Sequence, residues 1–186
     1  SEANVAIGKN ALGGAWVTAT SNFNTAVGSF SMDAAMNGAL YNTAVGGSSL
    51  TALTTGDNNV AIGSLSAEQL SEGDSNILIG RGSGETLTTS SNNIAVGYRA
   101  LYRATTQADN NVAIGHEAMS GNFTTADLDG CVAVGYGALI GVLTTAASST
   151  VAIGRESLAA LTSGARNLAI GYQAMDSLTT GADNIA

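Results

Sequence analysis

The sequence predicts an all-β fold, a parallel β-solenoid or β-roll of about ten coils, because one short unit recurs along all 186 residues. The unit centres on Ala-Ile-Gly or Ala-Val-Gly, with a Leu-Ile-Gly variant at Gly80. Successive glycines stand 17 to 20 residues apart, a period typical of stacked coils that cannot bury a core alone. These glycines occupy positions 8, 28, 46, 63, 80, 97, 115, 135, 154 and 171. We therefore treat residues 1–186 as a single repeat domain and expect it to be a fragment of a longer fibre.

The three residues before each glycine predict a short strand. In Val60-Ala61-Ile62, for example, β-branched residues flank an alanine. Side chains alternate along a strand, so the alanines should face one way and the Val and Ile side chains the other. Both faces are then apolar, and both need a cover. We expect the coil interior to cover one face and the uniformly small alanine column to lie against a neighbouring chain, which favours an intimate homotrimer.

The remaining positions of the unit predict turns and a second strand. An asparagine stands four residues before the glycine in nine of eleven copies, where it is expected to adopt left-handed geometry and to stack its amide from coil to coil. Cys131 and Thr150 are the exceptions. The glycine should form a corner with positive φ or close packing. Segments such as Leu53-Thr54-Thr55 are expected to form a second strand with leucine inward, followed by a polar loop.

Composition excludes several functional classes. A net charge of −8 argues against a nucleic-acid partner. The chain has no run of 18 apolar residues, so the sequence predicts no membrane span. Its single cysteine, Cys131, allows no internal disulfide. Charged residues are only 11% of the chain, which favours a surface that is rich in Ser, Thr and Asn or is covered by other chains.

The unit Asn93-Ile94-Ala95-Val96-Gly97-Tyr98-Arg99-Ala100-Leu101 resembles two related repeat families. One is the head repeat of trimeric autotransporter adhesins, and the other is found in tail fibres of phages and phage-like particles. The Leu-Thr-Thr segments and the spacing are more similar to the tail-fibre type. The resemblance implies a trimeric, non-catalytic fibre segment on a virion tail fibre or at the extracellular cell surface. It transfers no binding residues, because such families share a scaffold and not a site.

The sequence gives weaker support to interpretations in which the chain is an enzyme or binds a metal ion. We expect no enzyme, no cofactor and no metal site. His116-Glu117 lacks a placed nucleophile, and residues 80–86 lack the Gly-Lys-Ser/Thr ending of a phosphate-binding loop. A hexapeptide acyltransferase coil would need an aliphatic residue at Glu68. Calcium between stacked loop aspartates is an open alternative for Asp57, Asp74 and Asp109.

Two surface columns are candidate binding sites. Threonine pairs recur in the coils and give an alternative function, an ice-binding or other surface-binding solenoid. They stand at 54/55, 88/89, 105/106, 124/125, 144/145 and 179/180. The residue after each corner glycine gives the second column, which is rich in aromatic and basic side chains suited to a glycan or polyanion. Its candidate contacts for a host glycan or protein receptor are Tyr98, His116, Tyr136, Arg155 and Tyr172. The alternative explanation is that this corner is simply exposed to solvent and tolerates large side chains.

The function predicted from these observations is structural. We expect a homotrimeric fibre segment of a viral tail fibre or bacterial surface adhesin that supports or contributes to host attachment.

Overall fold

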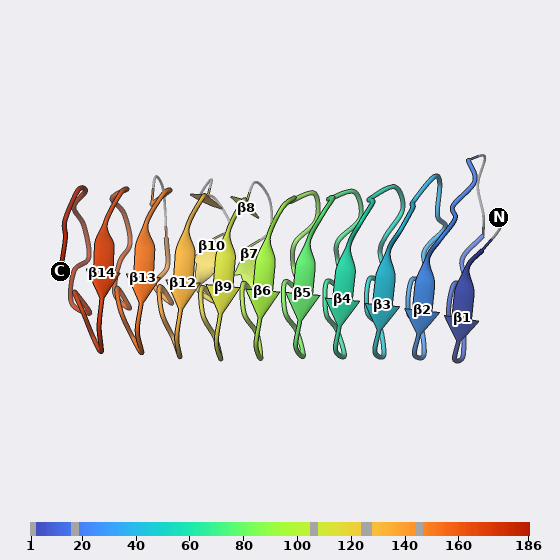
Figure 1. Cartoon of the computed structure of the whole chain (residues 1–186), viewed down its shortest axis with the longest axis horizontal. Helices are drawn as coiled ribbons and strands as arrows, with labels where there is room; N and C mark the ends of the chain where they lie inside the picture. Colours follow the sequence, from blue (N-terminus) through green and yellow to red (C-terminus); the bar gives the residue numbers. More distant parts are fainter. Residues whose placement is uncertain (1–2, 16–18, 105–107, 124–127, 144–146) are drawn as a thin grey trace.

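The predicted solenoid is confirmed. The computed structural model describes residues 3–15, 19–104, 108–123, 128–143 and 147–186, and these contain strands and turns but no α-helix. Ten short strands, one from each coil, form a single parallel sheet along the long axis of the molecule, with the chain ends at opposite ends of the row (Figure 1). They are β1 (Val5–Ile7), β2 (Thr25–Val27), β3 (Thr43–Val45), β4 (Val60–Ile62), β5 (Ile77–Ile79), β6 (Ile94–Val96), β9 (Val112–Ile114), β12 (Val132–Val134), β13 (Val151–Ile153) and β14 (Leu168–Ile170).

The register of the sheet is set by the repeat. Each strand pairs with the next so that the middle residues lie side by side, as Ala44 does beside Ala61 and Ala133 beside Ala152; Leu78 is the one middle residue that is not alanine. Two further pairs form on the segment that runs back from the corner to the loop, which we call the return limb. They are β7 (Arg103–Ala104) with β10 (Asn122–Phe123), and β8 (Ala108–Asp109) with β11 (Leu128–Asp129).

The alanine column fills the coil interior. Ala61, Ala95 and Ala113 are completely buried within this single chain. The flanking Val and Ile side chains point outward instead, with Ile94 38% and Ile114 40% exposed. The expectation that alanine faces a neighbouring chain is therefore wrong. The interior is narrow because leucines from the return limb enter it, and only a small side chain fits on the opposite wall.

Leu78 shows how tightly the interior is packed. It replaces alanine in the column and is completely buried. Space for it comes from Gly84 on the return limb, where a Cβ atom would lie only 2.9 Å from the Leu78 methyl groups. Neighbouring coils, which have alanine in the column, carry Ala67 and Leu101 at this position, so the one leucine of the column coincides with a glycine opposite it.

The asparagine ladder is confirmed, although its backbone geometry differs from the expectation. Asn76 donates from Nδ2 to Asn59 Oδ1 at 2.9 Å and to the Ser90 carbonyl at 2.9 Å. Its own Oδ1 accepts the backbone N–H of Asn93 at 3.0 Å. The left-handed residue is not the ladder asparagine but the one before it, such as Ser75 with φ of 59°. The asparagine side chain instead satisfies buried backbone groups that follow it in the chain and bonds the side-chain amide of the preceding coil.

The corner glycines confirm the prediction of positive φ. Gly115 has φ of 132°, and a Cβ there would lie 2.6 Å from the Gly135 carbonyl oxygen. The expected Leu-Thr-Thr strand is wrong in its regular form, because residues 53–55 are irregular, but Leu53 does point inward and is buried. Thr54 N–H bonds the Ser71 carbonyl of the next coil at 2.9 Å, so coils still join there without a strand.

Candidate functional site

The residue after each corner glycine begins the turn at one edge of the solenoid, and we call this set the corner column. From Tyr98 onward its side chains stack on one another. The Tyr98 and His116 rings have centroids 4.9 Å apart, and those of His116 and Tyr136 are 5.2 Å apart. Arg155 continues the stack, with its guanidinium carbon 5.4 Å from the Tyr136 ring centre and 5.9 Å from that of Tyr172. The five predicted contact residues thus form one continuous row.

The stacking decides which parts of these rings a ligand can reach. Because strand spacing is about 4.8 Å, each ring of the row covers the face of its neighbour. His116 is covered on both faces by tyrosines, yet its side chain is 49% exposed. The row therefore presents ring edges, hydroxyl groups and guanidinium N–H donors. These groups favour hydrogen bonding to polar or anionic ligands over stacking on an apolar sugar face.

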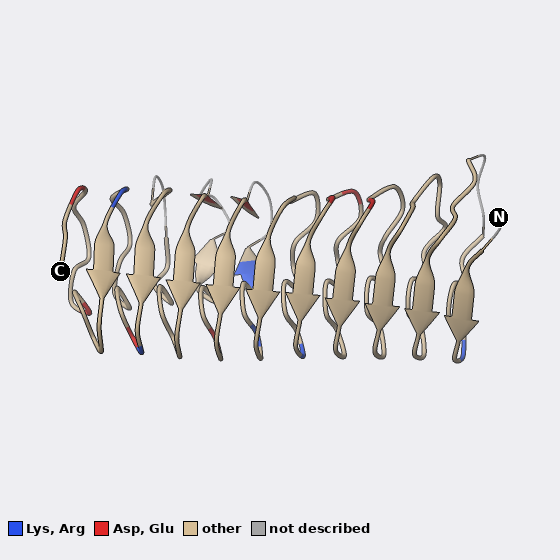
Figure 2. Ribbon diagram, viewed as in Figure 1, with Lys and Arg blue, Asp and Glu red and all other residues tan. Residues whose placement is uncertain are grey.

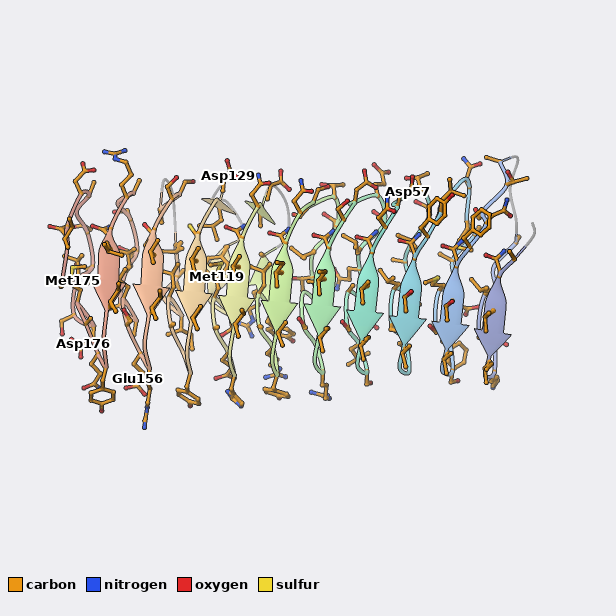
Figure 3. All side chains as sticks on the ribbon, viewed as in Figure 1. Asp57, Met119, Asp129, Glu156, Met175 and Asp176 are labelled. Carbon is orange, nitrogen blue, oxygen red and sulfur yellow. The ribbon has the colours of Figure 1, made fainter. Side chains whose placement is uncertain are left out.

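Basic residues are distributed unevenly between the two edges of the solenoid. Figure 2 shows mostly acidic segments along the loop edge, whereas the corner edge has most of the basic segments together with acidic ones. Asp57 and Asp129 lie at the loop edge, whereas Glu156 lies at the corner edge beside the column (Figure 3). Within a chain of net charge −8, the corner edge is thus the part that an anionic ligand can approach most easily.

Arg155 is held in the column by a network across two coils. It donates from Nη2 to Glu156 Oε1 at 3.2 Å, and Gln173 Nε2 donates to Glu156 Oε2 at 2.9 Å. The hydrogen bonds from Gln173 and Arg155 lower the pKa of the Glu156 carboxyl group. Glu156 therefore stays ionised and orients the guanidinium along the row.

The aspartates considered for calcium have another role. Asp57 Oδ1 accepts the N–H of Leu40 at 2.6 Å, and Asp74 Oδ1 accepts the N–H of Asp57 at 2.7 Å. Asp109 does the same for Ser91 at 2.7 Å. Within the described ranges, no group of three acidic, His or Cys side chains is arranged for a metal ion. These carboxylates brace one loop against the next.

The threonine pairs are only partly described, because 105/106, 124/125 and 144/145 lie outside the described residues. Thr54 donates its hydroxyl to the Ser71 carbonyl at 2.9 Å. Thr162 stands at the equivalent position of a later coil, where a serine follows it, and donates to the Thr179 carbonyl at 2.7 Å. These hydroxyl groups join coils, so they contribute less to a flat outward array than the sequence suggests.

The glycine-rich segment 80–86 forms the same corner as the other coils. Gly82 and Gly84 have φ of 64° and 58°, at the positions where Arg99 and Leu101 of the next coil also have positive φ. The segment therefore resembles a phosphate-binding loop only in its glycine content.

The sequence analysis missed Arg99, Tyr102 and Arg103, which lie next to the corner column. Arg99 places its guanidinium carbon 5.2 Å from the Tyr98 ring centre and 4.7 Å from that of Tyr102. A signal was present, since two of only six Lys and Arg residues fall within residues 99–103. The sequence does not predict that these three residues lie close to residues 117–122 of the next coil, because this proximity depends on the path of the return limb.

No family model matches the chain, and neither a curated protein nor a solved structure gives a match. Among the described residues, no helix is long and apolar enough to cross a membrane.

Proposed function

We propose that the chain is a structural fibre segment that assembles as a homotrimer through the outer face of its ten-stranded sheet. In this role it would extend a viral tail fibre or a bacterial surface adhesin and carry contacts to the host surface. The observation that supports the proposal is the outward Val and Ile face, which has no cover within the described chain.

The dimensions of this face argue for a partner. Ten strands at about 4.8 Å spacing and three residues at about 3.3 Å give a strip of about 50 Å by 10 Å. Its area is thus about 500 Å², at the upper end of what soluble monomers expose as one apolar patch. Ile77 and Ile94 lie in one row of it and Ile62 and Ile114 in the other, each between 38% and 40% exposed. Packing three such strips around an axis covers each of them and leaves the corner and return limb outside.

Assembly is testable with a charge on the face. Ile94→Asp should give a folded monomer, because the side chain is half exposed within its own coil but would bury a charge between chains. Thr55→Asp, on an exposed part of the return limb, is the matched control and should assemble normally. Sedimentation equilibrium should give three times the chain mass of 18.4 kDa for the parent and the control. A parent protein that stays monomeric, or an Ile94→Asp variant that still forms trimers, contradicts the proposal.

We assign host contact to the corner column, because it gathers cationic and hydroxyl donors on an edge that remains open. Removing Tyr136 and Arg155 together takes out the middle of the row. The double alanine variant should lose binding on a panel of neutral and acidic surface glycans while remaining trimeric. Ser29→Ala with Ser64→Ala, in the same column but in other coils, is the control. If the parent binds a glycan and both double variants bind it equally well, the corner column is only an exposed corner and does not make the host contact.

A further inference from the structure

A groove of about 300 Å³ opens on the return limb across the coils that begin at Gly97, Gly115 and Gly135. Its polar lining comes from Arg99, Tyr102, Arg103, Glu117, Ser120 and Asn122. Strands β7 and β10, which contribute Arg103 and Asn122, lie behind the ten-stranded sheet (Figure 1). The groove is therefore on the side of the coil away from the apolar strip.

A step in the return limb creates this groove. From Leu101 to Ala104, both buried, the chain advances three residues, whereas from Met119 to Phe123, also buried, it advances four. The added residue is accommodated around Gly121, whose α-carbon leaves no room for a Cβ against the Gly141 carbonyl. On the following coil, the residue that corresponds to Tyr102 is Ser120. Because Ser120 is small, no second ring lies beside the Tyr102 side chain there.

Aromatic rings contact both arginines of the groove, and the Glu85 carboxylate also interacts electrostatically with Arg99. Arg99 lies between Tyr98 and Tyr102, and its Nε is buried without a hydrogen-bond partner. The guanidinium carbon of Arg103 is 5.7 Å from the Tyr102 ring centre, on the solvent side. The ion pairs between described residues involve other basic groups, namely His116, Arg155 and Arg166. Cation–π contacts fix a guanidinium while leaving its terminal N–H groups able to bind an anion.

The rest of the lining suits a sugar ring. Ser120, Asn122 and Glu117 offer donors and acceptors for hydroxyl groups. Ile140 and Val142 form an apolar wall, and Val142 is 54% exposed. A volume of about 300 Å³ is at the small end for ligand sites, which limits the occupant to a small unit. A nucleic acid fits less well than a singly charged sugar, because the net charge of −8 on the chain repels a polyanion more strongly than a single negative charge.

We propose that this groove binds the terminal acidic unit of a saccharide, a pyranose bearing a carboxylate or a sulfate. The acid group would meet Arg99 and Arg103, the hydroxyl groups would meet Ser120, Asn122 and Glu117, and the apolar ring face would lie on Val142. This site adjoins the corner column, since Arg99 stacks on Tyr98, but none of its lining residues belongs to the column. It goes beyond the proposed fibre function, since it does not require the sheet face to be buried.

Ligand-observed NMR titration of the full chain tests the site. The acidic probes are methyl glucuronide, the methyl glycoside of N-acetylneuraminic acid and glucose 6-sulfate. Methyl glucoside is the neutral probe, and inorganic sulfate is the plain anion. At least one acidic sugar should bind saturably, with the neutral sugar and sulfate each about tenfold weaker or more. Binding of none of the three acidic sugars overturns the proposal, and so does equal binding of the glucoside or of sulfate.

Variants assign the binding to the groove. Arg103→Gln removes an exposed donor and Asn122→Asp adds a negative charge, and each should weaken the acidic sugar about tenfold. Arg166→Gln, an exposed arginine paired with Asp183 at the other edge, is the matched control and should bind as the parent does. Unchanged affinity in Arg103→Gln and Asn122→Asp overturns the assignment. Sedimentation of the same samples separates this failure from failure of the trimer.

Discussion

The coils between Gly46 and Gly97 and those between Gly97 and Gly154 have the same strand pattern but differ in length and in ladder residues. The first group repeats every 17 residues and has an unbroken asparagine ladder from Asn42 to Asn93. The second group has intervals of 18 to 20 residues, and Cys131 and Thr150 replace asparagine.

The differences appear in the structure as satisfied and unsatisfied polar groups. Asn59 and Asn76 each bond the coil before and the loop after. Thr150, in contrast, has a buried Oγ1 with no hydrogen-bond partner. The irregular group also contains the groove, the extra return-limb strands and the stacked rings of Tyr98, His116 and Tyr136. The uniform coils therefore act as scaffold, while the proposed groove and most of the proposed contact row occur where the repeat is broken.

The comparison predicts very different costs for changing equivalent positions. Asn76→Ala removes four hydrogen bonds and leaves the Ser90 carbonyl and the Asn93 N–H buried without partners. We expect a loss of about 4 kcal/mol in the free energy of unfolding. Thr150→Ala should lose less than about 0.5 kcal/mol, because its hydroxyl makes no bond. Denaturant titrations at one chain concentration measure both, and equal losses would contradict the contrast.

The sequence alone predicted the ladder, the parallel sheet and the corner glycines, because each follows from a residue type at a fixed spacing. The alternation of Val-Ala-Ile indicated two faces but not which was inside. That choice depends on the leucines of the return limb, which leave room for Ala95 but not for Ile94. The sequence also does not predict the positive φ of Leu101 and Met119, because these residue types rarely adopt that conformation. Hydrogen bonds to adjacent coils compensate this strain, as from Leu101 N–H to Ala118.

The candidate sites were predictable to different degrees. Contact along the corner column follows from equal register, since neighbouring coils place equivalent residues one strand spacing apart. The groove depends on a one-residue step between Leu101–Ala104 and Met119–Phe123, a departure from the repeat that the unit itself does not explain.

A second prediction concerns Cys131, the ladder position that can ionise. Burial raises the pKa of its thiol from 9.0 to about 11, although backbone hydrogen bonds from Thr150 and Ser149 oppose this. The thiol contribution to stability is therefore complete below pH 9 and is lost as pH rises toward 11. The full loss corresponds to about 3 kcal/mol.

Comparison with Cys131→Ala isolates this effect from tyrosine ionisation. The free energy of unfolding of the parent should fall more steeply than that of the variant between pH 9 and pH 11. Iodoacetamide should label the folded parent slowly at pH 8 and the unfolded chain rapidly. Parallel pH profiles, together with fast labelling of the folded protein, would mean that Cys131 is not held in a buried ladder.

The smallest expected effect comes from repairing the ladder at its unsatisfied position. Thr150→Asn places an amide where the repeat has one, and Gly164 lies fourteen residues ahead, as Gly73 does from its donor Asn59. A new bond from the amide to the Gly164 carbonyl should add about 1 kcal/mol to the free energy of unfolding. Cys131→Asn with Thr150→Asn should add more than the sum of the two single variants, because the two amides would bond each other, as Asn59 and Asn76 do. Calorimetry of the parent, both single variants and the double variant measures this coupling. A double variant that is no more stable than the parent would show that the longer coils hold the ladder positions too far out of line for amides to meet.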